Sequence, residues 1–439
     1  MLEESSVKTI VPVEELVSTS RLMEDLRAQR LEVAVTLTQA NLPELSIISG
    51  NFDKTVQANA SMLFEESACN FLISLSELIL KDPESREHGD VAAFAYWCRK
   101  SNLGKIRAQY TNSEMRKGRG LVFHIAPSNV PINFAFSFAF SLLAGNSNIV
   151  RLPSKQFPQE NFFFKHFDNA TSNSDFMHLR DSNAFVRYSK GSDITQQISQ
   201  IADARVIWGG DKTVQEISSL SKPLHAIDVC FIDKYSFSII DSLSILDLVD
   251  SNLQNLAERF YNDAYIFDQN ACSSPRTIVW IGNYEDTEFA KAKFWSLVQK
   301  VVEAKYQIED SSRMQKYLDL CLLSVDVNHP SLDFEIENSL VSRIQLNEFD
   351  LDYTGIRNRY GSFLEIRLES LSLLTKLVTR KFQTATYFGV SKDDLKEVVQ
   401  SGALKGIDRV VPMGSALDID IHWDGYDLPI ALSRIITIK

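Results

Sequence analysis

A cysteine with the setting of a nucleophile lies past the middle of the chain. Cys272 stands among small and polar residues in the run DQNACSSP (268–275), after a helical pattern and before a strand-like segment at 276–281. A thiol at such a junction can lie close to backbone N–H groups, which stabilise a thiolate and the oxyanion formed when it attacks an acyl carbon. An inert buried thiol is the alternative reading of a single cysteine. The residue types therefore suggest acyl transfer through sulfur.

The composition limits which classes of protein come into question. A chain of 439 residues predicts two or more domains, and 44% hydrophobic with 23% charged residues is typical of a soluble globular protein. A net charge of −12 argues against a nucleic-acid partner. Five widely spaced cysteines without a CxxC favour a reduced, cytoplasmic protein without a metal site. We expect no signal peptide and no membrane span, because the apolar run 130–145 is short and interrupted by polar residues.

Strands alternating with helices predict a parallel, doubly wound sheet after residue 118. The expected strands are four short apolar runs, at 120–125, 148–152, 184–188 and 204–208. A long apolar helix follows the first of them, and Gly145 is expected to end it as a C-cap glycine does. Such sheets bind ligands at the carboxyl ends of their strands. The candidate binding turns are therefore those at 126–131, 153–155 and 209–212.

The flanking regions have their own patterns. Residues 1–118 are expected to be mainly helical, beginning with an amphipathic stretch at 13–30. A second α/β segment is expected from about residue 236, with strands including 276–281, 343–346, 363–367 and 383–388. The apolar tail 435–438 predicts a final strand, of the kind that often pairs with another subunit.

Several motifs in one order resemble the aldehyde dehydrogenase superfamily. They are APSNVP (126–131), LAGN (143–146), VRLPSK (150–155), WGGD (208–211) and QNAC (269–272). Within that superfamily the chain is similar to the long-chain acyl-CoA reductases, the fatty acid reductase component of bacterial bioluminescence. The further motifs of that likeness are HIAPSNVP (124–131), AGNSNIVR (144–151), KFQTATYFG (381–389), GIDRVVP (406–412), LDID (417–420) and WDGYD (423–427).

The resemblance implies an aldehyde dehydrogenase-like α/β fold. It would comprise a Rossmann-type cofactor domain with a parallel sheet, an α/β catalytic domain and a small oligomerisation segment. The expected parts are a mainly helical N-terminal part packing on the cofactor domain (1–118), the dinucleotide-binding domain (119–235), the catalytic domain (236–412) and a C-terminal oligomerisation or return segment (413–439). Because the chain has no GxGxxG, the dinucleotide would bind without the common fingerprint.

The resemblance also implies roles for individual residues. Cys272 would become acylated, and Asn129 would donate a hydrogen bond to the oxyanion beside the backbone N–H of Cys272. Capping of the apolar helix is the alternative role of Asn129. The implied cofactor-binding residues are those of the three turns, namely Ala126, Pro127, Ser128, Arg151, Ser154, Lys155, Gly209, Gly210 and Asp211.

Two of these positions bear on which cofactor binds. Many NAD-dependent relatives carry a carboxylate where this chain has Lys155, so Lys155 with Arg151 nearby implies a 2′-phosphate and hence NADPH. Solvated surface cations are the alternative. Asp211 replaces the serine that is usual in the family, and Gly209–Gly210 could also form an ordinary turn.

The implied activity is NADPH-dependent reduction of a long-chain acyl-CoA, or of an acyl group from an acyl-protein synthetase, to a fatty aldehyde. The segment 231–236 lacks the glutamate with which many aldehyde dehydrogenases activate water, so an acyl-enzyme would resist hydrolysis. The alternatives are aldehyde oxidation, CoA-acylating aldehyde dehydrogenation, and a non-catalytic scaffold for an acyl-transferring partner. The family also implies a homo-oligomer, commonly a tetramer, in a fatty acid reductase complex. The candidates for a general acid or base are His124, His225, His422 and Asp233.

Overall fold

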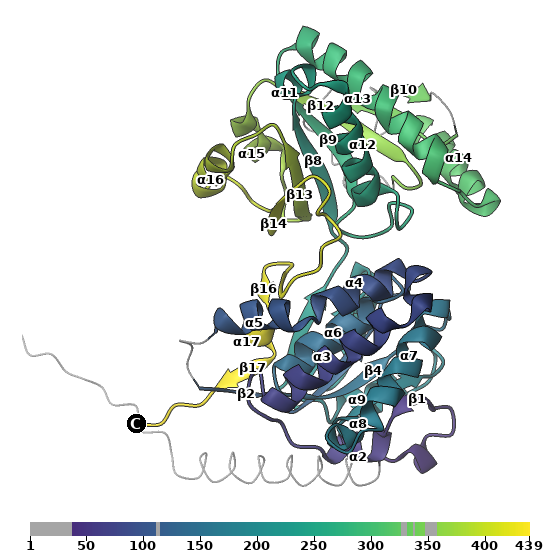
Figure 1. Cartoon of the computed structure of the whole chain (residues 1–439), viewed down its shortest axis with the longest axis vertical. Coiled ribbons are helices and arrows are strands. Elements are labelled where there is room, and N and C mark those ends of the chain that lie inside the picture. Colours follow the sequence, from purple (N-terminus) through teal and green to yellow (C-terminus); the bar gives the residue numbers. More distant parts are fainter. Residues whose placement is uncertain (1–36, 111–114, 326–331, 337–338, 347–357) are drawn as a thin grey trace, which may run out of the picture. The chain divides into compact units, whose positions relative to one another are not determined.

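Two compact units make up the chain. The computed structural model describes residues 37–110, 115–325, 332–336, 339–346 and 358–439 (Figure 1). The first unit comprises Met1–Cys230 and Pro429–Lys439, and the second comprises Phe231–Leu428. The end of the chain therefore returns to the first unit. The amphipathic stretch predicted at 13–30 lies outside the described residues.

A doubly wound sheet forms the centre of the first unit, as the sequence predicted. Its strand order is β1-β5-β4-β3-β6-β7. The bounds are β1 (Ser46–Gly50), β3 (Leu121–Ile125), β4 (Ser147–Arg151), β5 (Asn183–Arg187), β6 (Ala204–Trp208) and β7 (Ile227–Phe231). β3 pairs in parallel with β4 and with β6, β4 pairs in parallel with β5, and β1 runs antiparallel at the edge. The order along the sheet thus reverses at β3.

Helices cover both faces of this sheet. The helices of the unit are η1 (Gln39–Asn41), α2 (Phe52–Gln57), α3 (Glu66–Lys81), η2 (Pro83–Arg86), α4 (Gly89–Trp97), α5 (Lys100–Ala108), α6 (Asn133–Leu143), α7 (Pro158–Thr171), α8 (Met177–Asp181), α9 (Ile194–Ser199), α10 (Asp211–Ser218) and α17 (Leu428–Ala431), whose first residue lies in the second unit. Side chains of α2, α9 and α10 pack with the strands in one apolar cluster. The opposite face is covered by α6 and α7, on which α3 and α4 pack.

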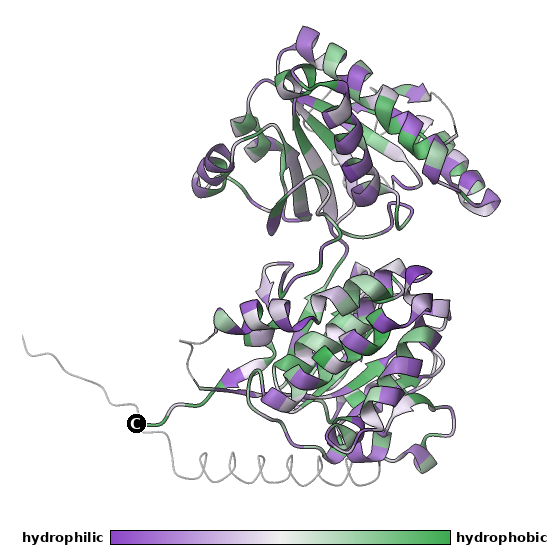
Figure 2. Ribbon diagram, viewed as in Figure 1, coloured by the Kyte–Doolittle hydropathy of each residue, from purple (hydrophilic) through white to green (hydrophobic). Residues whose placement is uncertain are grey.

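The helix α6 is buried along its whole length, and Figure 2 shows its hydrophobic character. Its phenylalanines pack edge to face against those of α4, α7 and β5; for example, the rings of Phe134 and Phe163 lie 5.1 Å apart and those of Phe138 and Phe185 lie 5.2 Å apart. Such pairs stabilise a core beyond the area that they bury. The run of phenylalanines that is conspicuous in the sequence therefore fills the core of the first unit.

Gly145 ends α6 as predicted. Its φ is 89°, in the left-handed region that glycine tolerates. The N–H of Gly145 donates to the carbonyl of Leu142 (2.9 Å), and that of Asn146 donates to the carbonyl of Ser141 (3.1 Å), which is the Schellman arrangement. A Cβ on Gly145 would come within 2.3 Å of the carbonyl oxygen of Ser61. A glycine is therefore required both by the turn and by the close approach of a neighbouring chain segment.

His124 is a structural histidine of the sheet. It is fully buried in β3, where Nδ1 lies 2.8 Å from Ser137 Oγ and Nε2 lies 3.0 Å from Asn148 Oδ1. The indole of Trp208 donates to the same Ser137 hydroxyl (3.1 Å). Burial lowers the pKa of His124 to about 4, although the bond to Asn148 works in the opposite direction. The ring is therefore neutral at neutral pH, and its bonds do not leave it available as a general acid.

This burial predicts an acid-sensitive first unit. Between about pH 6.5 and pH 4 the unfolded chain protonates His124 while the folded chain does not, so stability falls with falling pH. We expect a loss of roughly 2 kcal/mol from this group between about pH 7.5 and pH 5. His124→Gln should remove that part of the pH dependence in urea unfolding, whereas His178→Gln, at an exposed position, should retain it. Equal pH dependence in both variants would contradict the prediction.

The regions that flank the sheet differ from the expectation in two ways. Residues 1–118 were expected to be mainly helical, but β1 and β2 (Arg116–Gly118) also form there. The final strand was expected at 435–438, whereas β17 spans Ser433–Ile435 and pairs antiparallel with β2 of the same chain. The long-range pairing with β2 determines where this short strand begins and ends.

A second sheet forms the centre of the second unit, in the order β10-β11-β12-β9-β8-β13-β14. The bounds are β8 (Tyr235–Asp241), β9 (Pro275–Ile281), β10 (Leu332–Ile336), β11 (Ser342–Leu346), β12 (Ser362–Leu368), β13 (Phe382–Phe388) and β14 (Arg409–Pro412). Each neighbouring pair is parallel except β10 with β11. A short hairpin of β15 (His422–Trp423) and β16 (Tyr426–Asp427) follows β14.

Helices also cover both faces of the second sheet. They are α11 (Ser242–Leu246), α12 (Asp250–Ala264), α13 (Tyr284–Lys305), α14 (Asp310–Ser324), η4 (Leu371–Leu373), α15 (Leu374–Leu377) and α16 (Lys392–Gln400). One apolar cluster joins α11, α12 and α13 to the strands, and another joins α14, α15 and α16 to them. Within the part of the chain that the structure describes, no helix has the length and hydropathy needed to cross a bilayer.

Candidate active site

The three predicted binding turns meet at one edge of the first sheet. They follow β3, β4 and β6, and β3 lies between the other two strands. Because the three strands are parallel, their carboxyl ends share an edge, and the strand order reverses at β3. Such a reversal point is where open α/β sheets bind ligands. The fold therefore places the turns at 126–131, 153–155 and 209–212 side by side.

The turn after β4 carries two of the candidate cations. The guanidinium of Arg151 lies 4.9 Å from the centre of the Tyr188 ring, and Lys155 Nζ lies 4.8 Å from that of Phe157. Arg151 Nε is buried and, among the described residues, has no hydrogen-bond partner. Ser154 and Lys155 are exposed. A buried donor without a partner beside an exposed lysine fits a site for an anionic group.

A neighbouring strand holds this turn in place. Arg187, at the end of β5, donates from Nε to the carbonyl of Pro153 (2.9 Å) and also forms an ion pair with Glu160. The N–H of Leu152 donates to the carbonyl of Val186 (2.9 Å). Two bonds to β5 thus position the backbone immediately before Ser154 and Lys155.

The turn after β3 begins with a buried residue and ends exposed. Ala126 is buried and donates its N–H to the carbonyl of Arg151 (3.0 Å), Pro127 is partly buried, and Ser128 and Asn129 are exposed. The N-cap of α6 is Ile132, three residues after Asn129, and the first residue of the helix is Asn133. The alternative role of Asn129 as the helix cap is therefore wrong.

The turn after β6 leaves open space at its second glycine. A Cβ on Gly209 would come within 3.1 Å of the Thr213 side chain, whereas a Cβ on Gly210 would meet no atom of the described residues within 4 Å. Gly210 is the N-cap of α10, with φ −66°, and Asp211 is the exposed first residue of that helix. The backbone itself does not require glycine at Gly210. The open space there is available to a ligand approaching the first N–H groups of α10.

Cys272 lies at the amino end of β9, in the second unit. The loop that carries it contains two non-glycine residues in the left-handed region, Asp268 (φ 52°) and Gln269 (φ 60°). Such residues persist only where the surrounding structure holds them. The Tyr306 hydroxyl donates to the Asp268 carboxylate (2.7 Å), and the Asp268 carbonyl accepts from the N–H of Tyr360 (3.2 Å).

Gln269 is the principal support of this loop. Its side chain is fully buried and uses every bond that an amide can make. Nε2 donates to the carbonyls of Pro275 (3.0 Å) and Ser362 (2.9 Å), and Oε1 accepts from the N–H groups of Gly361 (3.1 Å) and Ser362 (3.2 Å). The loop is thus tied to the amino end of β9, where Cys272 lies, and to that of β12.

Polar groups from two further strands and from a hairpin turn surround the Cys272 thiol and its backbone. Gln383 Nε2, on β13, donates to Cys272 Sγ (3.5 Å) and to the carboxylate of Asp424, which lies between β15 and β16. Ser236 Oγ, on β8, donates to the carbonyl of Cys272 (2.7 Å). The sequence motifs contained Gln383 and Asp424 but assigned them no role, because these contacts join residues far apart in the chain.

Cys272 is a partly exposed residue, but its thiol holds its proton firmly. Burial of the sulfur and, to a smaller extent, the Asp424 carboxylate together raise the pKa of Cys272 to about 11. The bond from Gln383 and the positive charge of Arg276 lower the pKa of the thiol by less. Cys272 is therefore protonated at rest, and attack on an acyl carbon requires a group that takes up its proton.

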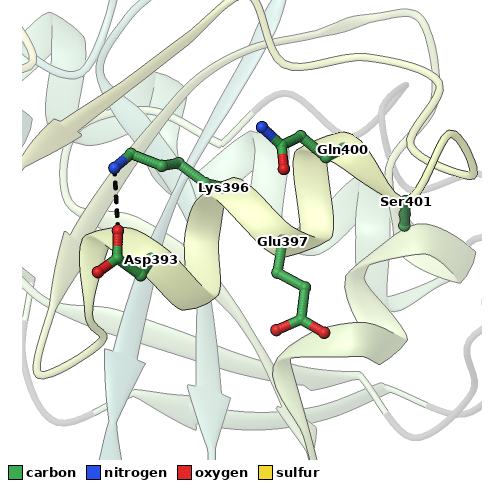
Figure 3. A pocket seen from close by; sticks show the side chains of 5 residues that line it. All are labelled: Asp393, Lys396, Glu397, Gln400 and Ser401. Carbon is green, nitrogen blue, oxygen red and sulfur yellow. Dashed lines mark hydrogen bonds and ion pairs between the residues drawn. The ribbon is translucent and has the colours of Figure 1, made fainter.

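One surface hollow lies apart from these residues. It lies on α16 and is lined by Asp393, Lys396, Glu397, Gln400 and Ser401 (Figure 3). Lys396 Nζ pairs there with Asp393 Oδ1 at 2.9 Å, and all five side chains are exposed. None of these residues belongs to the candidate site, and the hollow has the character of a solvated helix surface.

Comparison with known proteins bears on this arrangement. The family model described as acyl-CoA reductase (LuxC) matches residues 98–318, half of the chain. The chain belongs to this acyl-CoA reductase family. The family that the sequence motifs resembled is thereby confirmed. The matched region includes the three candidate turns and Cys272.

Curated relatives of the family are more distant in sequence. The long-chain acyl-protein thioester reductase of Vibrio harveyi is 23% identical over 301 residues, which cover 67% of this chain and 59% of that protein. Long-chain acyl-protein thioester reductase 2 of Photobacterium leiognathi is 27% identical over 174 residues, which cover 39% of this chain and 34% of that protein. These matches span less than two thirds of the length of either relative.

Solved structures confirm the predicted fold class. A 1-pyrroline-5-carboxylate dehydrogenase from Thermus with bound NAD has a TM-score of 0.60 at 13% identity, over 83% of this chain and 77% of that one. An NADP-dependent glyceraldehyde-3-phosphate dehydrogenase from Bacillus halodurans C-125 complexed with NADP has a TM-score of 0.56 at 14% identity, over 84% and 85%. The family member therefore has an aldehyde dehydrogenase-like α/β fold.

Proposed function

We propose that the protein reduces a long-chain fatty acyl thioester to the fatty aldehyde, with NADPH, through a thioester at Cys272. The observation that carries this proposal is the placement of Cys272 on a loop that a fully bonded, buried glutamine supports, in a chain of the acyl-CoA reductase family. The names of the relatives, long-chain acyl-protein thioester reductases, support an acyl thioester as substrate. We include acyl-CoA and an acyl group delivered by an acyl-protein synthetase as donors.

In this proposal Cys272 Sγ attacks the carbonyl carbon of the acyl thioester, and the donor thiol leaves. Asn129 and the backbone N–H of Cys272 donate to the oxyanion, whose charge exists only near the transition state. No glutamate occurs in the segment 231–236, which leaves water poorly activated and preserves the acyl-enzyme. The nicotinamide, when bound, supplies the hydride that reduces the acyl carbon and releases the aldehyde.

The first unit would hold the cofactor at the three turns. Arg151 and Lys155 would bind the 2′-phosphate, with Ser154 at the adjacent ribose, and the partnerless Nε of Arg151 fits that task. The turn from Ala126 to Ser128 would contact the nicotinamide half. Gly209, Gly210 and Asp211 would lie along the pyrophosphate, where the open space at Gly210 lets the backbone approach closely. We further propose that the protein works as a homo-oligomer.

A comparison of two assays tests the proposal. Turnover with NADPH and a series of saturated acyl-CoA substrates should yield aldehyde, with little oxidation of fatty aldehyde by NAD. Efficient CoA-dependent oxidation of aldehyde by NAD, without acyl-CoA reduction, would favour the CoA-acylating alternative and overturn ours. No nicotinamide binding by fluorescence would instead favour the scaffold alternative.

Lys155→Glu should alter the preference between cofactors. The substitution removes a cation and places a negative charge where the 2′-phosphate would lie, so NADPH binding should weaken by about tenfold to a hundredfold while NADH binding changes little. Fluorescence titration with each cofactor measures this. Lys105→Glu, the same charge change at an exposed position on α5, is the matched control. Equal weakening for both cofactors would contradict the assignment of Lys155 to the 2′-phosphate.

A further inference from the structure

Asp424 is placed to exchange a proton with the nucleophile, and this inference rests on the proposed function. Asp424 and Cys272 share one donor atom, the Nε2 of Gln383, which bonds to the Asp424 carboxylate and lies 3.5 Å from Cys272 Sγ. Two groups that bond to one nitrogen lie close enough to exchange a proton directly or through one water. We propose that Asp424 takes the thiol proton of Cys272 during acylation and returns it to the departing thiol.

The surroundings hold the carboxylate toward the sulfur rather than toward its own turn. Asp424 has a left-handed backbone (φ 49°) between the strands of the β15–β16 hairpin, a position where aspartate often serves only the turn. Here Asp424 is half-buried, and its carboxylate accepts from the side chain of Gln383, which is itself 1% exposed. The contact therefore joins the turn of the β15–β16 hairpin to β13 of the second sheet.

Arg409 holds in place the loop between β14 and β15, which precedes Asp424 in the chain. Its guanidinium donates to the carbonyls of Ala416 (2.8 Å) and Ser415 (2.8 Å), and it lies 4.8 Å from the centre of the Trp423 ring. Trp423 immediately precedes Asp424. These contacts make Arg409 a positioning residue for the loop, while its own donors are occupied by backbone carbonyls.

The charged groups around Cys272 and Asp424 are compatible with Asp424 acting as the proton acceptor. Lys234, paired with Asp408 at 3.1 Å, faces Asp424, and Arg276 and Arg409 lie on the side of Cys272. Burial, with a smaller contribution from Asp408, raises the pKa of Asp424 to about 6 against the opposing effects of Gln383 and Lys234. At neutral pH the carboxylate is therefore mostly ionised and can accept a proton, whereas below about pH 6 it cannot.

The proposed step balances without another reactant. The S–H bond of Cys272 breaks as its proton passes to Asp424 and its sulfur bonds to the acyl carbon. The carbon–sulfur bond to the donor then breaks, and the proton of the Asp424 carboxylic acid passes to the departing thiolate. The acyl group moves from one sulfur to another, nothing is oxidised or reduced, and Asp424 is again ionised.

Asp424→Asn separates this role from a structural one, because two reactions of the same sulfur should change in opposite directions. Acylation of Cys272 by acyl-CoA, followed by intact mass, should slow by about a hundredfold or more, since the acceptor is lost. Alkylation by iodoacetamide should become faster or stay unchanged, since removal of the negative charge makes the thiolate easier to form. The decline of the acylation rate below about pH 6 should also disappear.

Two further variants make the test specific. Asp424→Glu retains a carboxylate and should recover part of the acylation rate. Asp427→Asn, in the same hairpin, should acylate like wild type. Acylation by Asp424→Asn at the wild-type rate, or a parallel loss of acylation and alkylation, would overturn the inference alone. Absence of any acyl adduct on the wild-type protein would overturn the proposed function together with this step.

Discussion

Replacement of Cys272 by alanine should abolish aldehyde formation while leaving the fold intact. We expect turnover to fall by roughly 10³-fold to 10⁴-fold or more, because the covalent route is lost and no other group can carry the acyl chain. The side chain is partly exposed and its removal leaves the bonds of Gln269 and Ser236 in place. The thermal unfolding temperature should therefore change little. Initial rates of NADPH oxidation with acyl-CoA, beside thermal unfolding, measure both effects.

Other cysteines supply the control for this substitution. Cys321 is free and partly exposed, on the helix α14 of the same unit. Cys321→Ala should reduce acyl-CoA at the wild-type rate. Substantial turnover by Cys272→Ala, or an equal loss in Cys321→Ala, would mean that the reaction does not proceed through the sulfur assigned here.

Gln269→Leu should destabilise the second unit more than any other single substitution that we consider. Leucine nearly fills the same volume but removes four hydrogen bonds to buried backbone groups, of which the N–H of Ser362 keeps another partner, the carbonyl of Arg359 (3.2 Å). Each unsatisfied buried group costs about 1–3 kcal/mol, so we expect a loss of about 3 kcal/mol or more after partial rearrangement. Chemical unfolding of the variant beside wild type measures this loss.

The same substitution should also impair the site. Asp268 and Gln269 retain left-handed backbones only while these bonds hold the loop, so acylation of Cys272 should fall with stability even at temperatures where the variant remains folded. Gln400→Leu, at an exposed position on α16, is the matched control and should alter neither property. A Gln269→Leu protein as stable as wild type would contradict the supporting role of this glutamine.

The sequence alone was sufficient to predict those strands and helix ends that depend on a local pattern of residue types. The strands of the first sheet appear as short apolar runs between turn residues, and Gly145 with its neighbours indicates the Schellman end of α6. The bounds of the short strands β2 and β17 were not predicted. Each strand forms by pairing with the other, which lies more than 300 residues away in the chain. Isolated segments of three residues carry no periodicity that could reveal them.

The residues of the candidate site likewise fall into two groups, those that a local motif predicted and those that only long-range contacts bring together. Cys272 and the three turns were found because their motifs are continuous in the sequence, although their roles stay predictions. The supports of Cys272 were not found, since Gln383 reaches it across 111 positions and Gln269 reaches Ser362 across 93. The capping role considered for Asn129 failed because α6 begins four residues later than the asparagine. Contacts between distant strands, rather than spacing, determine these groups.

If Cys272 carries the acyl group that becomes the aldehyde, this acyl-enzyme can be detected directly by mass spectrometry. The wild-type protein is mixed with acyl-CoA in the absence of NADPH, and the peptide that contains Cys272 is analysed by mass spectrometry before and after NADPH is added. We expect a mass increase equal to the acyl group on that peptide, which disappears upon addition of NADPH with release of an equal amount of aldehyde. An unmodified Cys272, or an adduct that persists in the presence of NADPH, would contradict this role of Cys272.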